Sequence, residues 1–300
     1  MAGKQVTELD ALPSFTDTSL LPVHNGAGLK KGSLSQLANY LGKKFSNPNL
    51  LINPDFKINQ RGNETYTKDN QGPAIYTVDR WVVWNGTLDA NSMLLKAYDS
   101  GIGLLMQRLE NKINGIATVS FEVSSISGTL TALARGTSGN SLGEISVTQK
   151  GIYQFTANGE ISDITFKISA GGSVTFAWAK LEHGSIATPF VAPNPAEELV
   201  KCLRFSRYIP VLYCTPYRRY LSEITTSQQY FLPSDCVFEN KLRTKGTITV
   251  GGVYDTTGAS MTGVKSIEYT ADEIRAITLS GSVNNYIIML KKVFIDAEIY

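Results

Sequence analysis

The feature that most constrains this chain is a two-residue alternation of apolar and polar side chains between residues 49 and 190. In one such run Ile164, Phe166 and Ile168 occupy alternate positions, which places them on one face of a β-strand. The runs lie about 8 to 15 residues apart and are separated by pairs that predict turns, such as Asn-Gly at 114–115 and 158–159 and Gly-Gly at 171–172. Because no helical pattern interrupts them, the sequence predicts an antiparallel β-sandwich of the jelly-roll type.

One predicted strand, at residues 174–181, is apolar on both faces. Strict alternation divides its side chains into two sets: Val174, Phe176 and Trp178 on one face, and Thr175, Ala177, Ala179 and Leu181 on the other. An outer face in contact with water would carry polar side chains. We therefore expect this strand to be central in its sheet or to be covered by a neighbouring subunit.

Proline-rich boundaries and changes of pattern divide the chain into four parts. Three prolines fall between residues 189 and 195, and strand patterns return beyond residue 209. The predicted organisation is an N-terminal segment at residues 1–47, a jelly-roll sandwich at 48–193, a linker helix at 194–208 and a second β-rich domain at 209–300. The predicted fold class is mainly β, with an antiparallel jelly-roll sandwich, a second β-rich domain and a short N-terminal extended-plus-helix segment.

A short helix is predicted at residues 33–41. Ser33 and Gln36 form a capping box, in which each side chain accepts a hydrogen bond from the other residue's backbone amide. Leu34, Leu37 and Leu41 then form one apolar stripe. A helix of about two turns is marginal in water, so the stripe is expected to dock on partner chains or on another protein.

A second helix is predicted to begin at Asn194, which is placed to cap it ahead of Pro195. Glu197 and Lys201 are four residues apart and are expected to form an ion pair. The apolar side of this helix carries Leu199, Cys202 and Leu203. Leu199 and Leu203 therefore join the leucines of the first helix as candidate interface residues.

Composition and charge argue against several classes of partner. The 28 Lys and Arg residues balance 26 Asp and Glu residues, leaving a formal charge of +2, so neither nucleic acid nor anionic lipid is an expected partner. The longest aliphatic run, at residues 287–290, is far below the roughly 20 residues that span a bilayer. The first ten residues carry no apolar core of a signal peptide. We expect a protein that is made in a cytosol and does not insert into membranes.

The sequence contains few of the residues and motifs that catalysis requires, and we therefore expect neither an enzyme nor a bound cofactor or metal. The chain has only two His and three Cys residues, and no motif of a zinc, P-loop or dinucleotide site. Residues 139–143 satisfy G-x-S-x-G around Ser141, with Asp163 and His183 following in hydrolase order. However, a strand follows this motif where a hydrolase needs a helix, so a hairpin tip is the favoured interpretation. An esterase or depolymerase that depends on Ser141 stays as an alternative.

Aromatic and basic residues supply the candidate ligand contacts. Trp81 is expected in the core, whereas Trp84 precedes an Asn-Gly turn and is expected to be partly exposed. Further candidates lie in the last third of the chain: Tyr217, Arg218, Tyr220 and Tyr230. Aromatic faces beside polar groups suit sugar rings, and they equally suit a subunit interface.

Several blocks of sequence resemble one family. They are residues 49–56 (NLLINPDF), 59–62 (NQRG), 76–81 (YTVDRW), 178–190 (WAKLEHGSIATPF), 197–199 (EEL) and 202–205 (CLRF). In this order they resemble a carbohydrate-binding-module-like jelly roll of bacteriophage tail fibre and receptor-binding proteins. The segment from Leu20 through the first helix is similar to virion-attachment segments of such fibres.

The resemblance implies a structural virion protein that is assembled in the host bacterial cytoplasm. It would join other tail or portal-proximal proteins through residues 1–47 and bind a host cell-surface saccharide through its C-terminal domain. The alternative is a collar or adaptor protein whose C-terminal domain holds another fibre protein and binds no receptor. The resemblance carries no catalytic residues.

We predict a homotrimer, because the resemblance implies one and the apolar helix stripes need partner surfaces. Light scattering of the full chain at micromolar concentration should give three times the chain mass, and a monomer mass would contradict this prediction.

Overall fold

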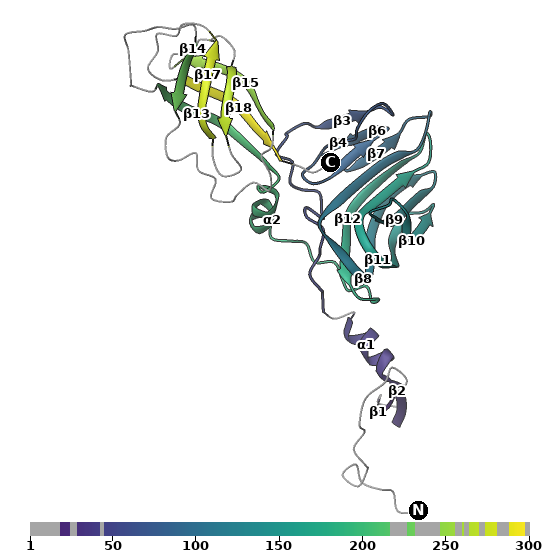
Figure 1. The fold of residues 1–300 in the computed structure, drawn as a ribbon. Helices are drawn as coiled ribbons and strands as arrows, with labels where there is room; N and C mark the ends of the chain where they lie inside the picture. The colour runs from purple at the N-terminus through teal and green to yellow at the C-terminus, as the bar shows by residue number, and fades with distance from the viewer. Residues whose placement is uncertain are drawn as a thin grey trace, which may run out of the picture.

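The fold was examined in a computed structural model, which describes residues 19–24, 29–42, 45–216, 227–231, 247–255, 260, 264–269, 274–280 and 288–297. These residues are mostly β-strand, and all of their named strand pairs are antiparallel (Figure 1). A hairpin with a helix comes first, a jelly-roll sandwich second and a six-stranded sheet third. The predicted fold class, mainly β with a sandwich and a second β-rich part, is confirmed.

The N-terminal unit, residues 19–42, consists of β1 (Leu20–His24), β2 (Leu29–Ser33) and α1 (Leu34–Gly42). The two strands pair with each other, and the helix follows directly. The capping box is confirmed, since the Ser33 amide donates to Gln36 Oε1 at 2.8 Å and the Gln36 amide donates to Ser33 Oγ at 3.1 Å. These two bonds satisfy amide groups that the first helical turn leaves without partners.

Ten strands form the jelly roll. They are β3 (Thr65–Lys68), β4 (Ile75–Tyr76), β5 (Val82–Trp84), β6 (Gly86–Asp89), β7 (Leu94–Ala97), β8 (Gly103–Ser127), β9 (Leu130–Gly136), β10 (Ser141–Val147), β11 (Gly151–Ile168) and β12 (Ser173–His183). The main path of pairing runs β10-β9-β11-β8-β12-β7-β6-β3, with β5 also on β8. The first half of β8 lies between β5 and β11, and its second half lies between β12 and β11. The two long strands therefore run through both layers of the sandwich.

Two glycines explain how the long strands change layer. Gly115 in β8 pairs with Gly159 in β11, and both have positive φ, at 94° and 141°. The expectation that the Asn-Gly pairs at 114–115 and 158–159 are turns is therefore wrong. Glycine adopts these angles without steric cost, so here the paired strands bend together and continue.

The core lies between the two layers. The ring of Phe166 in β11 is 5.2 Å from that of Phe121 in β8 and 4.8 Å from that of Phe176 in β12. Trp81 is fully buried, as predicted, and its ring is 4.8 Å from that of Phe56. Each such aromatic pair contributes about 0.5–1.5 kcal/mol beyond the area that it buries.

Strand β12 departs from strict alternation. Phe176 pairs with Val123 and Trp178 with Glu122, so Ala177 is an extra residue that forms a β-bulge. The bulge turns Trp178 to the outer face, where its ring stacks on Phe190 at 4.6 Å. The expectation that Trp178 shares a face with Phe176 is therefore wrong. The strand lies between β8 and β7, so it is central in its sheet. This position is one of the two alternatives predicted from its two apolar faces.

The covering segment, residues 184–190, lies over the outer face of β12 and buries an ion pair there. Lys180 and Glu182 are 1% and 0% exposed, with Nζ and Oε2 3.4 Å apart. Lys180 Nζ donates to Thr188 Oγ1 at 2.6 Å and to Ser46 Oγ at 3.1 Å, and the Thr188 amide donates to Glu182 Oε1 at 2.8 Å. Burial lowers the pKa of Lys180 below its ordinary value, and Glu182 partly offsets this effect. The pair fixes the covering segment to the sandwich.

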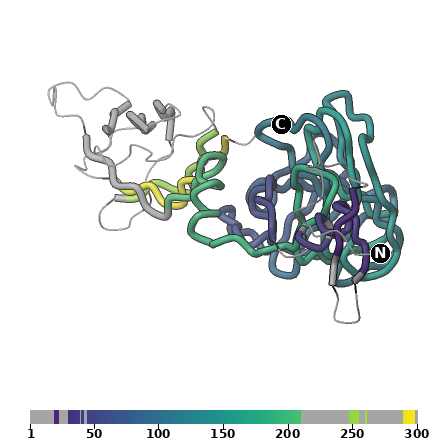
Figure 2. The backbone as a smooth tube through the Cα atoms, turned by 90° about the horizontal axis from the view of Figure 1, so that it is seen from below, coloured from purple at the N-terminus to yellow at the C-terminus, as the bar shows by residue number. Residues whose placement is uncertain are grey.

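The C-terminal sheet has the strand order β15-β18-β13-β14-β17-β16. Its strands are β13 (Ser206–Pro216), β14 (Ser227–Phe231), β15 (Thr247–Asp255), β16 (Val264–Tyr269), β17 (Ile274–Ser280) and β18 (Ile288–Asp296). Figure 1 shows this sheet beside the jelly roll, and Figure 2 shows its coloured strands β15 and β18 beside the jelly roll, with α2 (Pro195–Cys202) in the connection. Asn194 caps α2 as predicted, because its side chain accepts from the Ala196 amide at 3.0 Å.

A set of buried and partly buried residues, here called the joint, connects α2 and the C-terminal sheet to the jelly roll: Asn53, Gln60, Arg61, Asp79, Arg80, Glu198 and Phe205. The Asn53 amide donates to Glu198 Oε1 at 2.6 Å, and Lys201 Nζ donates to Glu198 Oε2 at 2.8 Å. The predicted pair between Glu197 and Lys201 is therefore wrong. Because the Glu198 carboxylate is buried, the positive charge of Lys201 stabilises it more than it would stabilise the exposed carboxylate of Glu197.

Arg61 and Arg80 complete the joint from the jelly-roll side. Arg61 Nη2 lies 2.9 Å from Asp296 Oδ2 at the end of β18, and its Nη1 lies 3.8 Å from Asp79 Oδ1. The Arg80 guanidinium lies 3.8 Å from the centre of the Phe205 ring, which is fully buried. The two β-rich parts are therefore joined by the partly buried Arg61–Asp296 ion pair and by the buried contact of Arg80 with Phe205, as well as by the chain.

We predict that Glu182→Gln lowers the free energy of unfolding by about 3–5 kcal/mol, because Lys180 would stay buried without an opposite charge. Urea denaturation followed by tryptophan fluorescence measures this change. The matched control is Glu160→Gln, which removes the carboxylate of an exposed ion pair with Lys112 at 2.6 Å and should leave the midpoint unchanged. Equal losses in the two variants would contradict the role assigned to burial.

Candidate functional site

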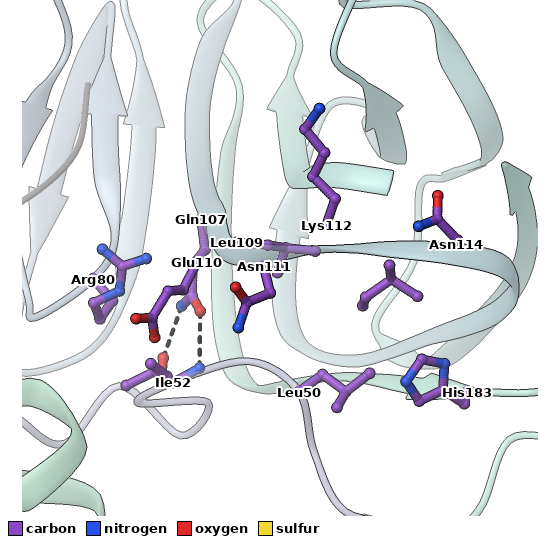
Figure 3. Close-up of a pocket in the computed structure, with 11 residues that line it drawn as sticks. Leu50, Ile52, Arg80, Gln107, Leu109, Glu110, Asn111, Lys112, Asn114 and His183 are labelled. Atoms are coloured by element: carbon purple, nitrogen blue, oxygen red, sulfur yellow. Dashed lines mark hydrogen bonds between the residues drawn. The ribbon is translucent and has the colours of Figure 1, made fainter. Parts of the chain in front are cut away.

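A groove on the jelly roll is the candidate site that the structure brings together (Figure 3). It lies between β8 and residues 50–52 and has a volume of about 280 Å³. Its apolar lining comes from Leu50 and Ile52 on one side and from Leu109 and Ile113 of β8 on the other. The volume is near the lower end of the range for small-ligand pockets.

Gln107 holds the two sides of the groove together. Its side-chain amide donates to the Ile52 carbonyl at 2.7 Å, and its Oε1 accepts from the Ile52 amide at 2.8 Å (Figure 3). The Leu50 amide donates to the Leu181 carbonyl at 2.8 Å. These backbone contacts fix residues 50–52 as an extra, short partner of the sandwich, so the groove does not depend on a free loop.

Asn111 and His183 provide the polar groups that face the groove. Figure 3 shows Leu50 between them, with Asn111 coming from β8 and His183 from the end of β12. Both side chains are exposed, and the described part of the chain offers neither of them a hydrogen-bond partner. An amide and an imidazole together can donate and accept hydrogen bonds without carrying a fixed charge.

The charged residues around the groove are engaged elsewhere. Lys112 Nζ lies 2.6 Å from Glu160 Oε1, and Glu110 Oε1 lies 2.7 Å from Arg204 Nη2. Arg80 Nη2 donates to the Arg108 carbonyl at 2.6 Å. The groove therefore presents the Asn111 amide and the His183 imidazole against an apolar lining.

The ligand residues predicted from the sequence do not form one site among the described residues. Trp84 is partly buried in β5 and pairs with Leu104. Tyr230 belongs to β14 of the C-terminal sheet, opposite Pro216 and Ile277. Tyr217, Arg218 and Tyr220 lie outside the described residues.

The predicted interface leucines lie on the two helices. On α1, Leu37 and Leu41 are 41% and 42% exposed, and Leu34 is half-buried. On α2, Leu199 is 37% exposed and Leu203 is half-buried. The stripe on α1 thus faces away from most of the described chain.

The G-x-S-x-G sequence forms a hairpin, as interpreted from the sequence. Strands β9 and β10 pair on either side of it, and Ser141 opposes Arg135. Asp163 Oδ1 accepts from Arg135 Nε at 2.7 Å, and His183 lines the groove. The hydrogen bonds of a catalytic triad do not link Ser141, Asp163 and His183.

The described ranges of the chain contain no cluster of three or more His, Cys, Asp or Glu side chains that could hold a metal ion. The two helices that they contain are also too short and too polar to cross a membrane.

No protein-family model matches the chain, and no curated protein matches it. Similar solved structures include a sialidase, with 10% identity, a TM-score of 0.28 and coverage of 56% of this chain and 26% of that one. The N-terminal CBM22-1-CBM22-2 tandem domain from Paenibacillus barcinonensis Xyn10C has 10% identity, a TM-score of 0.28 and coverage of 84% and 98%. Discoidin II of Dictyostelium discoideum has 12% identity, a TM-score of 0.22 and coverage of 65% and 77%. These likenesses are remote, and the chain spans about a quarter of the sialidase.

The sequence analysis did not predict that Asn111 and His183 line the same groove. They are 72 positions apart in the numbering, and the Asn-Gly pair at 114–115 indicated a turn just beyond Asn111. The block WAKLEHG did mark the end of β12, where His183 lies. The pairing of β8 with β12 is what brings the two side chains to one groove.

Proposed function

We propose that this protein is a structural component of a bacteriophage tail, a fibre or appendage that attaches the particle to the host surface. The N-terminal unit would join the particle, and the C-terminal β-rich part would meet a host saccharide. The observation that carries the proposal is the exposure of large apolar side chains at the N-terminal end. Of twelve such side chains in the described residues, five fall between residues 20 and 45: Leu20, Leu37, Tyr40, Leu41 and Phe45.

The N-terminal unit has too little structure to be stable alone. A single two-stranded hairpin is marginally stable in water, and so is a helix of nine residues. Exposed apolar side chains on such a unit favour burial against other chains, either further copies of this protein or another virion protein. This is the behaviour that a particle-anchoring segment requires.

The joint supports the same proposal from the other end of the chain. A fibre must hold its distal part in a fixed orientation if contact with the host is to be transmitted to the particle. The ion pair between Arg61 and Asp296 of β18, whose side chains are 9% and 32% exposed, opposes independent motion of the two parts. The sequence resemblance to tail fibre proteins agrees with this division of roles.

A substitution in the α1 stripe tests the attachment role. We predict that Leu37→Glu with Leu41→Glu leaves the chain folded but at least about tenfold less incorporated into particles, because the charges oppose burial of the stripe. Incorporation is measured by immunoblotting purified particles after complementation of a phage that lacks the protein. The matched control is Ile152→Glu, an exposed apolar residue on β11, which should be incorporated normally.

Normal incorporation of the α1 variant would contradict the anchoring role of the N-terminal unit. Host binding by particles that carry the protein distinguishes the two roles considered for the C-terminal part, which are receptor binding and attachment of a second fibre protein. Particles that carry the protein but lose adsorption when its C-terminal part is blocked by an antibody support receptor binding. Adsorption that depends wholly on a second fibre protein supports the collar or adaptor alternative.

A further inference from the structure

We propose that the two segments through which the chain enters and leaves the jelly roll form a clasp, which opens under tension before the sandwich unfolds. The entry segment is residues 46–49, which follow the N-terminal unit, and the exit segment is the covering segment, residues 184–190. That tension acts on the protein in a particle rests on the function proposed above. The clasp itself is a property of the isolated chain and is tested there.

The two segments are bonded directly to each other. Ser46 Oγ donates to the Pro189 carbonyl at 2.8 Å, and the Asn47 amide donates to Thr188 Oγ1 at 2.9 Å. The partners in these two bonds are 143 and 141 positions apart in the sequence. Tension that arrives along the entry segment therefore passes to the exit segment without crossing the strands that lie between them in sequence.

The direction of the two segments determines how the clasp opens. Ser46 contacts Pro189, whereas the amide of Leu50 donates to the carbonyl of Leu181, so the partner's number falls as the residue number rises. The segments are thus antiparallel, and the chain enters and leaves at the same end of the clasp. Force that pulls these two ends apart breaks the contacts one after another, which needs less force than breaking a whole strand ladder at once.

Charged groups lie buried beneath the clasp. Lys180 Nζ contacts both segments, because it donates to Thr188 Oγ1 at 2.6 Å and to Ser46 Oγ at 3.1 Å. Lys180 and Glu182 are 1% and 0% exposed, and opening would return their hydration. Ser120, opposite Lys180 on β8, is 4% exposed, and its hydroxyl has no hydrogen-bond partner among the described residues. Hydration of these groups offsets part of the cost of opening, so the clasp opens more easily than an apolar contact of the same size.

Opening of the clasp ends where the sheet begins. Leu181 lies opposite Val119 of β8, and the bond from Leu50 holds it on its other side. The chain that is freed amounts to about 11 residues, which lengthen the molecule by about 35–40 Å when they are extended. Unfolding of the whole sandwich lengthens it by roughly 500 Å. The two events are therefore distinguishable by their length, and local opening of this kind has a lower free energy than global unfolding.

Optical tweezers on the full chain test the proposal. The handles are attached through Phe45→Cys and Val191→Cys, at side chains that are 68% and 66% exposed, after the three native cysteines are changed to serine. We expect a step of about 35–40 Å at low force, followed at higher force by a step of roughly 500 Å. A thermal unfolding curve that matches the wild type verifies that the handle variant is folded.

A variant of the clasp locates the short step. Thr188→Val keeps the size of the side chain but removes the contacts of its hydroxyl with Lys180, Glu182 and the Asn47 amide. The short step should then occur about tenfold faster at equal force, because several hydrogen bonds are lost, and the long step should keep its force. The matched control is Thr156→Val, at an exposed threonine of β11, which should change neither step.

Hydrogen exchange of the unmodified chain gives a second measurement that needs no handles. The Asn47 amide, which donates to Thr188, should exchange with a lower free energy of opening than the amide of Val119 in β8.

Four results would overturn the proposal: a single long step with no short step before it, a short step that Thr188→Val leaves unchanged, an equal effect of Thr188→Val on both steps, or exchange of the Asn47 amide only with that of Val119. None of these results bears on attachment through the N-terminal unit, which is measured on particles with the α1 variant. Failure of the clasp and failure of the attachment role are therefore distinguishable.

Discussion

The buried side chain of Asn53 is the point on which the arrangement of the molecule depends. Its Nδ2 donates to the carbonyls of Ile58 and Asp79, and its Oδ1 accepts from the Ile58 amide. Its backbone carbonyl accepts from Trp81 Nε1 at 2.9 Å, and its amide donates to Glu198. Asn53 has a φ of 53°, a left-handed conformation that asparagine tolerates better than most residues. One residue thus connects the entry of the jelly roll, the segment before β5 and helix α2, and an apolar replacement would leave several buried polar groups without partners.

This constraint brings together residues from distant parts of the sequence. Asn53, Arg61 and Asp79 are far from Glu198 and Phe205 in sequence, yet all five belong to the joint. Their contacts serve the packing of two β-rich parts against each other, and the candidate groove lies beside the joint and shares Arg80 with it. The Glu110–Arg204 ion pair connects the groove to the segment after α2, so the groove and the joint share one side of the jelly roll.

Local signals in the sequence predicted local structure well. The capping box at Ser33, the cap at Asn194 and the two-residue alternation depend on neighbouring residues only, and each is present. Predictions failed where a distant partner decides the outcome. Gly115 bends a strand because Gly159 faces it, and Trp178 changes face because one residue of β12 bulges against β8. The groove lies beyond sequence reasoning for the same reason, since its residues meet only through the pairing of long strands.

Through the joint, the jelly roll and the C-terminal sheet are expected to open as one body. Native-state hydrogen exchange of the full chain, with Glu198→Ala as the test variant, measures this most directly. In the wild type, the amides of Val293 in β18 and Val119 in β8 should exchange with the same free energy of opening, because separation would leave buried charges without partners. In the variant, Val293 should exchange faster than Val119. Independent exchange of the two amides in the wild type, or no change in the variant, would contradict the account.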